Sequence, residues 1–289
     1  MPRLVAAGHR PIAAVRGRAV SPGVEGIAWD PEAGTIDAAA LDGIGGVVHL
    51  AGAGIADRRW TESRKHLILE SRTKGTGLLA STLVGLDHPP SVVVSGSAVG
   101  YYGDCGDQPL TEDSPAGTDF AAQVCQRWET AAQPVVGAGV RLVTIRTGIV
   151  LGAHGGMLGR VLAPFRVGLG GRIGSGQQYM SWVSIDDEVG AIIHALDRPS
   201  LAGPVNVTAP NPVTNAEFTT TLGHVLGRPT PIPTPVAPLR LVYGSELVRD
   251  LLLGGQRVLP KALTEDGYQF THATLDGALR AVLGRADAA

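Results

Sequence analysis

Short apolar runs of strand length alternate with longer stretches of helical periodicity through the first half of this 289-residue chain. The helical stretches extend from Thr61 to Val84 and from Asp119, a candidate N-cap, to about Val136. Strands and helices that alternate at this spacing predict right-handed βαβ units and a mostly parallel sheet covered on both faces. The predicted fold class is therefore α/β, with a doubly wound sheet. The strand-length runs are Pro11–Arg16, Gly46–Gly52, 91–95 and Val140–Arg146.

The ends of these predicted strands carry small, polar and basic residues. In doubly wound sheets, ligands bind in the crevice beyond the carboxyl ends of the strands. Those ends hold Arg16, Ala51–Gly52, Ser95–Ser97 and Thr147–Gly148. The stretch Ser95–Gly103 packs serines, glycines and tyrosines together after three valines, which is typical of a strand end at a crowded pocket. We expect these segments to converge on one binding crevice.

Charge and cysteine usage exclude several classes of protein. A formal net charge of −2 offers no electrostatic attraction for nucleic acid or an anionic membrane. Cys105 and Cys125 fit no zinc-site spacing and are expected to be free thiols in a reducing compartment. No run approaches the ~18 apolar residues of a membrane span. We expect a cytoplasmic protein that binds a small molecule, and neither nucleic acid nor a membrane. Whether it forms a homodimer stays open.

The second half of the chain is less regular. After Gly152 the pattern becomes glycine-rich, before Trp182–Asp187 restores a strand that is followed by a helix to Leu196. We expect Asp186 and Asp187 at this junction to supply an N-cap and a surface charge. The tail alternates helices with proline-rich turns, and the last helix is expected at 274–283. The predicted domains are 1–206, with a substrate-side insertion at about 153–180, and a smaller α/β cap at 207–289.

The start of the chain departs from the usual plan of such folds. A dinucleotide-binding fold begins with a strand and a glycine-rich turn, which lets the next helix approach a pyrophosphate. Residues 2–7 instead resemble the last turns of a helix that is closed by Gly8. We therefore expect that Met1 is an internal start and that the first strand and its loop belong to a longer protein. Without that central strand, two neighbouring strands would have unpaired edges.

The chain resembles the atypical extended short-chain dehydrogenases/reductases. In particular, it resembles the NAD(P)-dependent epimerase/dehydratase-like proteins that carry a C-terminal domain of unknown function. The resemblance extends from one end of the chain to the other. It is carried by Val48–Gly52, Ile55–Trp60, Ser71–Arg72, Ser95–Gly103, Arg146–Leu151, Gly174–Tyr179, Gly254–Lys261 and Gly267–Phe270.

This resemblance implies a Rossmann-type fold, NADP(H) as cofactor and a family C-terminal domain at about 239–285. Arg16 follows the second strand of such a fold, where a guanidinium can pair with a 2′-phosphate. The alternative for Arg16 is an ordinary surface charge. The expected cofactor-binding residues are Arg16, Ala51, Gly52, Ser95 and Val150.

The proton-transfer residues of that family are absent. Its typical members use a Ser or Thr that holds a substrate oxygen, and a Tyr-x-x-x-Lys helix whose lysine lowers the phenol's pKa. Ser97 matches the first position. The residues four places after the five tyrosines are Cys105, Gly106, Val183, Leu247 and His272, so the chain has no Tyr-x-x-x-Lys.

We consider Tyr102, and less strongly Tyr101, as replacement proton donors. Arg72 stands where the family commonly has an asparagine, and it can favour a phenolate or bind a substrate anion. The alternative is that both tyrosines are packing residues. Cys125 lacks a base partner in the sequence and is expected to be a core thiol. The predicted catalytic residues are Ser97, Tyr102 and Arg72.

Two classes of function fit these observations. The first is an NADP(H)-dependent epimerase or oxidoreductase that acts on an unidentified small molecule with atypical catalytic residues. The second is a catalytically silent NADP(H)-binding sensor or scaffold. The glycine-rich segment and the cap favour the first, because a sensor needs no elaborate substrate chamber. The missing Tyr-x-x-x-Lys favours the second.

Overall fold

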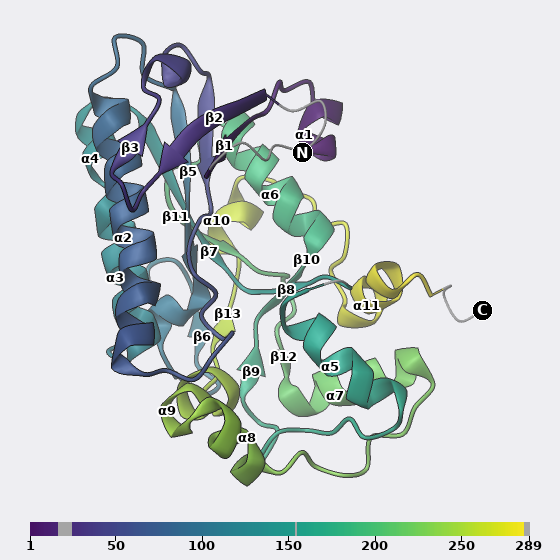
Figure 1. Cartoon of the computed structure of the whole chain (residues 1–289). Helices are drawn as coiled ribbons and strands as arrows, with labels where there is room; N and C mark the ends of the chain where they lie inside the picture. Colours follow the sequence, from purple (N-terminus) through teal and green to yellow (C-terminus); the bar gives the residue numbers. More distant parts are fainter. Residues whose placement is uncertain (17–24, 154, 286–289) are drawn as a thin grey trace.

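The computed structural model describes residues 1–16, 25–153 and 155–285, and a parallel sheet lies at its centre (Figure 1). The sheet consists, in spatial order, of β11 (Gly203–Val207), β7 (Arg141–Thr147), β5 (Val92–Ala98) and β4 (Gly46–His49). Helices α2 (Glu62–Val84) and α3 (Phe120–Ala132) pack on one face, and α6 (Ile185–Asp197) packs on the other. The structure is the α/β, doubly wound class that the alternating pattern predicts.

Capping side chains set the starts of the two long helices on the first face. The Thr61 hydroxyl accepts from the backbone N–H of Arg64 at the start of α2, and Asp119 caps α3 as predicted. The second helix ends earlier than expected, at Ala132. Proline at position 134 has no N–H to continue the helical bonding, so a separate turn, α4 (Pro134–Gly137), follows.

A second, smaller sheet precedes the central one. After α1 (Pro2–Ala6), strand β1 (Ile12–Val15) pairs in parallel with β2 (Glu25–Asp30), which pairs with β3 (Thr35–Ile36); the short helix η1 (Ala39–Leu41) follows. Within the described ranges, β1 pairs only with β2 and β4 pairs only with β5. Two unpaired strand edges therefore exist, as the sequence predicts. An additional strand between them stays a prediction.

The stretch Ser95–Gly103 is not a loop throughout. Strand β5 continues to Ala98, three residues beyond the predicted end, because its backbone pairs with β7 up to the Ala98–Thr147 position. The single turn η2 (Val99–Tyr102) follows, and Gly103 then reverses the chain at φ +68°. Ser95 and Ser97 are two residues apart and so share one face of the strand, with Ser97 nearer to its carboxyl end.

The second half of the chain builds its own hydrophobic core from two separated segments. The first segment contains β8 (Ile149–Leu151), α5 (Gly156–Arg166), β9 (Tyr179–Met180) and β10 (Trp182–Ser184); the second contains β12 (Val213–Thr214), α7 (Asn215–Leu226) and α11 (Leu275–Leu283). Trp182 is fully buried between them, among Leu151, Phe218 and Leu279. The predicted insertion and cap thus share one core, while their boundaries stay predictions.

The remaining elements are β6 (Pro109–Leu110), α8 (Val236–Tyr243), α9 (Ser245–Leu247), η3 (Val248–Leu253), β13 (Arg257–Val258) and α10 (Lys261–Glu265).

The acidic pair at the start of α6 does not act as predicted. Ser184 is the N-cap, and Asp187 is fully buried instead of capping the helix. The Asp187 carboxylate accepts from the backbone N–H groups of Thr271 and His272 at 2.7 and 3.0 Å. Asp187 therefore links the C-terminal segment to α6, and of the two acids only Asp186 is an exposed charge.

No helix in the described part of the chain is both long and apolar enough to cross a membrane.

Candidate functional site

A row of polar side chains crosses three strands of the central sheet near their carboxyl ends. The backbone register places Ser97 of β5 opposite Arg146 of β7, and Arg146 opposite Asn206 of β11. All three residues are buried, with exposed fractions of 5%, 3% and 0%. Buried polar groups must find partners, so their contacts define what this region can do.

An ion pair between β7 and α3 neutralises the arginine of this row. Arg146 donates from Nε and NH2 to the two oxygens of Glu129 at 2.9 and 3.0 Å, a bidentate pair. The Ser97 hydroxyl donates to the same carboxylate at 2.7 Å. The hydrogen of Ser97 is therefore committed, while its oxygen can still accept a hydrogen bond from a ligand hydroxyl.

Tyr102 is part of the same buried network. Its hydroxyl donates to Asn206 Oδ1 at 2.6 Å and accepts from Arg146 NH1 at 3.1 Å. Burial raises the pKa of Tyr102 to about 12, even though the Arg146 hydrogen bond lowers it. The Arg146 guanidinium also lies 3.4 Å from the ring centre of Tyr101. The cation beside the tyrosines is thus Arg146 and not Arg72, and Tyr102 is a neutral phenol at pH 7.

Arg72 lies at the end of β4 instead. Its NH1 donates to Ala53 O at 2.8 Å and to Ile68 O at 3.0 Å, and its guanidinium lies 4.9 Å from the ring centre of Trp128. Gly52 packs directly on it, since a Cβ there would come within 3.0 Å of the Arg72 Cγ and Cζ atoms. Arg72 therefore supports the loop that follows β4.

The thiol of Cys125 is a core group, as expected. Its Sγ contacts Ala98 O at 3.6 Å, and burial raises the pKa of Cys125 to about 11. A thiol with this pKa carries almost no thiolate at pH 7, so it is a poor nucleophile. Cys105 is also free and is partly buried.

The predicted cofactor residues are distributed over several strand ends. Arg16 follows β1 and is half-exposed; among the described residues it forms one ion pair, a 3.5 Å contact with Glu32, which is itself largely exposed. Ala51 and Gly52 follow β4, and Val150 lies within β8, where it pairs with Val183 of β10. These positions agree with a ligand that extends along the carboxyl edge of the strands.

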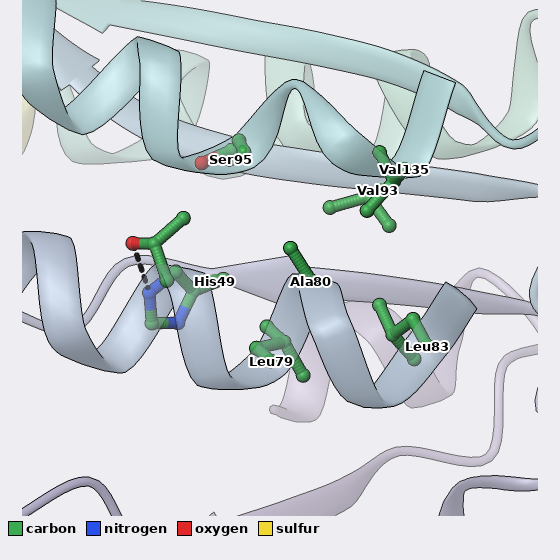
Figure 2. Close-up of a pocket in the computed structure, with 9 residues that line it drawn as sticks. His49, Leu79, Ala80, Leu83, Val93, Ser95 and Val135 are labelled. Carbon is green, nitrogen blue, oxygen red and sulfur yellow. Dashed lines mark hydrogen bonds between the residues drawn. The ribbon is translucent and has the colours of Figure 1, made fainter. Parts of the chain in front are cut away.

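Ser95 is the exception, because its side chain points away from that edge. It is fully buried, and its hydroxyl has no hydrogen-bond partner among the residues that the structure describes. The hydroxyl lines an internal cavity of about 10 Å³ between the sheet and α2, together with His49 and Thr76 (Figure 2). His49 Nε2 lies 2.9 Å from Thr76 Oγ1, and burial lowers the pKa of His49 to about 4. The Ser95 side chain is thus a core group and cannot contact a ligand in the crevice.

Removal of this hydroxyl should stabilise the fold. We expect Ser95→Ala to raise the free energy of unfolding by about 1 kcal/mol, because it deletes a buried hydroxyl without a partner. Ser91→Ala is the control and should lower stability slightly, since the Ser91 hydroxyl donates to Gly45 O at 2.8 Å. Urea titration of the three proteins measures both effects. A clear loss of stability in Ser95→Ala would show that this hydroxyl has a partner.

Glu188 is a candidate site residue that the sequence analysis missed. One of its oxygens accepts from the Thr147 hydroxyl at 3.0 Å, at the carboxyl end of β7, while the other is buried without a partner. Burial raises the pKa of Glu188 to about 7, against the lowering effect of that hydrogen bond. The sequence signal was a glutamate in the first turn of an apolar helix. Arg146, a charge within an apolar strand, was a similar signal.

Two family models match the chain. The NAD dependent epimerase/dehydratase family matches residues 3–208, and a domain of unknown function, DUF1731, matches residues 234–282. An epimerase family protein of Mycobacterium tuberculosis is 46% identical over 255 residues, which cover 88% of this chain and 84% of that protein. Human epimerase family protein SDR39U1 is 39% identical over 265 residues, 91% of this chain and 88% of its own.

Solved structures agree with these matches. The crystal structure of human SDR39U1 isoform 2 with NADPH has a TM-score of 0.88 and 36% identity, and the match covers 98% of this chain and 94% of that one. A nucleoside-diphosphate sugar epimerase from Corynebacterium glutamicum has a TM-score of 0.79 and 35% identity, over 98% and 54% of the two chains. The chain belongs to the NAD dependent epimerase/dehydratase family.

Proposed function

We propose that this protein binds NADP(H) and acts as an epimerase- or oxidoreductase-type enzyme on a small molecule that carries a hydroxyl group. The single observation that carries the cofactor choice is Arg16, a half-exposed guanidinium at the carboxyl end of β1. A guanidinium at this place suits a 2′-phosphate, whereas an NAD site has a carboxylate there. The crystal structure of human SDR39U1 with NADPH supports the same choice.

The residues at the strand ends fit such a cofactor. Arg16 would hold the 2′-phosphate, and the backbone of Ala51, Gly52 and Val150 would line the rest of the edge. The described residues before β1 form α1 and a link, so the part of the chain described here has no glycine-rich turn for the pyrophosphate. When bound, the cofactor supplies hydride transfer.

Ser97 has a defined part in this proposal. Because its hydrogen is donated to Glu129, the Ser97 oxygen is left as an acceptor. A substrate hydroxyl could donate to it, which favours an alcohol in this position over a carbonyl. Arg146 holds the Glu129 carboxylate in place through the bidentate pair, so it positions Ser97 through that carboxylate.

The alternative function is a catalytically silent NADP(H) sensor or scaffold. The observation that favours it is Tyr102, whose hydroxyl is enclosed by Asn206 and Arg146 and is a weak proton donor. Two labelled reactions separate the two functions: NADPH deuterated at C4 with carbonyl compounds, and NADP+ with sugars and other hydroxyl compounds deuterated at the carbinol carbon. An enzyme should transfer the label stereospecifically in at least one of these reactions, and a sensor should transfer none.

Arg16 provides a direct test of the cofactor. We expect Arg16→Ala to weaken NADPH binding by about 10–100-fold, as the loss of charge-assisted hydrogen bonds predicts, and to change NADH binding little. Arg10→Ala, which removes an exposed arginine before β1, is the matched control. Calorimetric titration with both dinucleotides gives the result. Equal weakening for NADPH and NADH would remove the assigned role of Arg16.

The place of action that we propose is the cytoplasm. Both Cys105 and Cys125 are free, and free thiols persist in a reducing compartment.

A further inference from the structure

Three arginines hold the loop of residues 51–60, which connects β4 to α2. Arg72 donates to Ala53 O at 2.8 Å, Arg64 donates to Gly54 O at 2.5 Å, and Arg160 of α5 donates to Ala56 O at 2.5 Å. Backbone carbonyls carry no net charge, so these bonds cancel none of the three positive charges; Asp57 pairs with Arg160 and Arg64, and Arg72 has no carboxylate partner among the described residues. We define this loop with Arg64, Arg72 and Arg160 as the arginine loop.

The arginine loop has more positive than negative charge. Asp57 is its one acid, at 2.7 Å from Arg160 and 3.7 Å from Arg64. Arg58 and Arg59 are further exposed cations in the same loop. Because the whole chain has a formal net charge of −2, this surplus is a local feature. Such a concentration of one sign attracts a ligand of the opposite sign.

Arg72 is the buried centre of this surplus. It is only 9% exposed, and no carboxylate in the described ranges lies within 4.0 Å of it. Arg146, the other buried arginine of the site, is neutralised by Glu129. A buried cation without a counter-ion is unfavourable unless a ligand supplies the negative charge.

The hydrogen bonds of Arg72 also show which of its donors are free. NH1 uses both of its N–H groups, for Ala53 O and Ile68 O. The Nε and NH2 donors have no hydrogen-bond partner in the part of the chain that the structure describes, and they lie side by side on one edge of the guanidinium. Two parallel N–H groups match the two oxygens of a carboxylate.

Trp128 contacts both Arg72 and the residue that precedes Ser97. The Arg72 guanidinium lies 4.9 Å from the centre of the Trp128 ring, and a Cβ at Gly96 would lie 2.7 Å from Trp128 Cζ2. The Arg72 guanidinium and Ser97 therefore both adjoin the region around Trp128.

We propose that Arg72 binds the carboxylate of the substrate, with Arg64 adding positive charge, and that the substrate is a small hydroxy acid. The proposal rests on the proposed function, since Ser97 receives the hydroxyl of the same molecule. In this role Arg72 determines which substrates bind, and it does not take part in proton transfer. Gly52 is required because a side chain there would displace the guanidinium.

Trp128 provides the signal for a test, because it stacks on Arg72. The protein is titrated with sodium glycolate, with inorganic phosphate and with chloride at constant ionic strength, while tryptophan fluorescence is recorded. We expect saturable binding of glycolate only, at least tenfold weaker binding in Arg72→Lys, and none in Arg72→Met. Trp128→Phe should lose the signal. Circular dichroism checks that each variant is folded, and Arg72→Lys keeps the test valid where Arg72→Met does not fold.

Parallel titrations with NADPH distinguish a failure of the Arg72 proposal from a failure of the proposed cofactor. Glycolate binding without NADPH binding would leave the Arg72 site standing and overturn the proposed cofactor. NADPH binding without glycolate binding would overturn the Arg72 site alone. Preference for phosphate over glycolate, or equal glycolate binding by wild type and both Arg72 variants, would also overturn it.

Discussion

Replacement of Arg146 by methionine is expected to lower the free energy of unfolding by about 3–5 kcal/mol, the usual effect of removing one partner from a buried ion pair. The Arg146 side chain is 4% exposed and that of Glu129 is 14% exposed. The change leaves the Glu129 carboxylate buried with only the Ser97 hydroxyl as a donor. Urea denaturation at pH 7, followed by circular dichroism, measures the loss.

Two further variants show whether the loss comes from the uncompensated charge. The double variant Arg146→Met/Glu129→Met should recover a large part of the stability, because neither charge then remains buried. Lys74→Met breaks an exposed pair with Glu70 and should change stability by less than about 1 kcal/mol. A double variant as unstable as Arg146→Met would contradict this explanation.

Substitution of Glu188 by glutamine should stabilise the protein at high pH. The folded-state pKa of Glu188 is raised by burial to about 7, from an ordinary value of 4.5. Below pH 4.5 the carboxyl group is protonated in both states, so it has no effect. As the pH rises from 4.5 to about 7, the carboxyl group ionises in the unfolded chain but stays protonated in the folded one, so stability is lost over this range and stays low above it. The full difference corresponds to about 3 kcal/mol at 1.36 kcal/mol per pKa unit.

We therefore expect Glu188→Gln to be about 3 kcal/mol more stable than the wild type at pH 8 and equal to it at pH 4. The glutamine keeps an oxygen that can accept from Thr147. Glu265→Gln, at an exposed position, is the control and should follow the wild type at both pH values. Urea titrations at pH 4, 6 and 8 measure the difference. A pH-independent difference would mean that Glu188 does not titrate in this range.

The position of Tyr102 beside a cation could be expected from the sequence, but the identity of that cation could not. Arg72 and Arg146 are both near the predicted crevice, on α2 and β7. Only the pairing of β5 with β7 brings Arg146 under the tyrosines, and only the packing of α3 supplies Glu129 to neutralise it. Arg72 meets a loop and a tryptophan instead.

The burial of Ser95 and Asp187 could not be predicted from the sequence either. Both are small polar residues at strand–helix junctions of the sequence, where exposed or capping roles are usual. Because β5 extends to Ala98, Ser95 lies three residues before the end of the strand, and its side chain is in the core and not at the strand end. The C-terminal segment covers Asp187 and uses its carboxylate for the N–H groups of Thr271 and His272. These contacts join residues that are far apart in the chain.

The doubly wound fold, the starts of the long helices and the strand ends at which the site lies could be predicted from the amino-acid sequence. Those features depend on local periodicity, capping and alternation, which neighbouring residues specify. The neutralisation of Arg146 but not of Arg72, and the rise in the pKa of Glu188 to about 7, follow from tertiary contacts. Burial and charge pairing depend on which distant elements meet, because desolvation and the Coulomb interaction act through space and not along the chain.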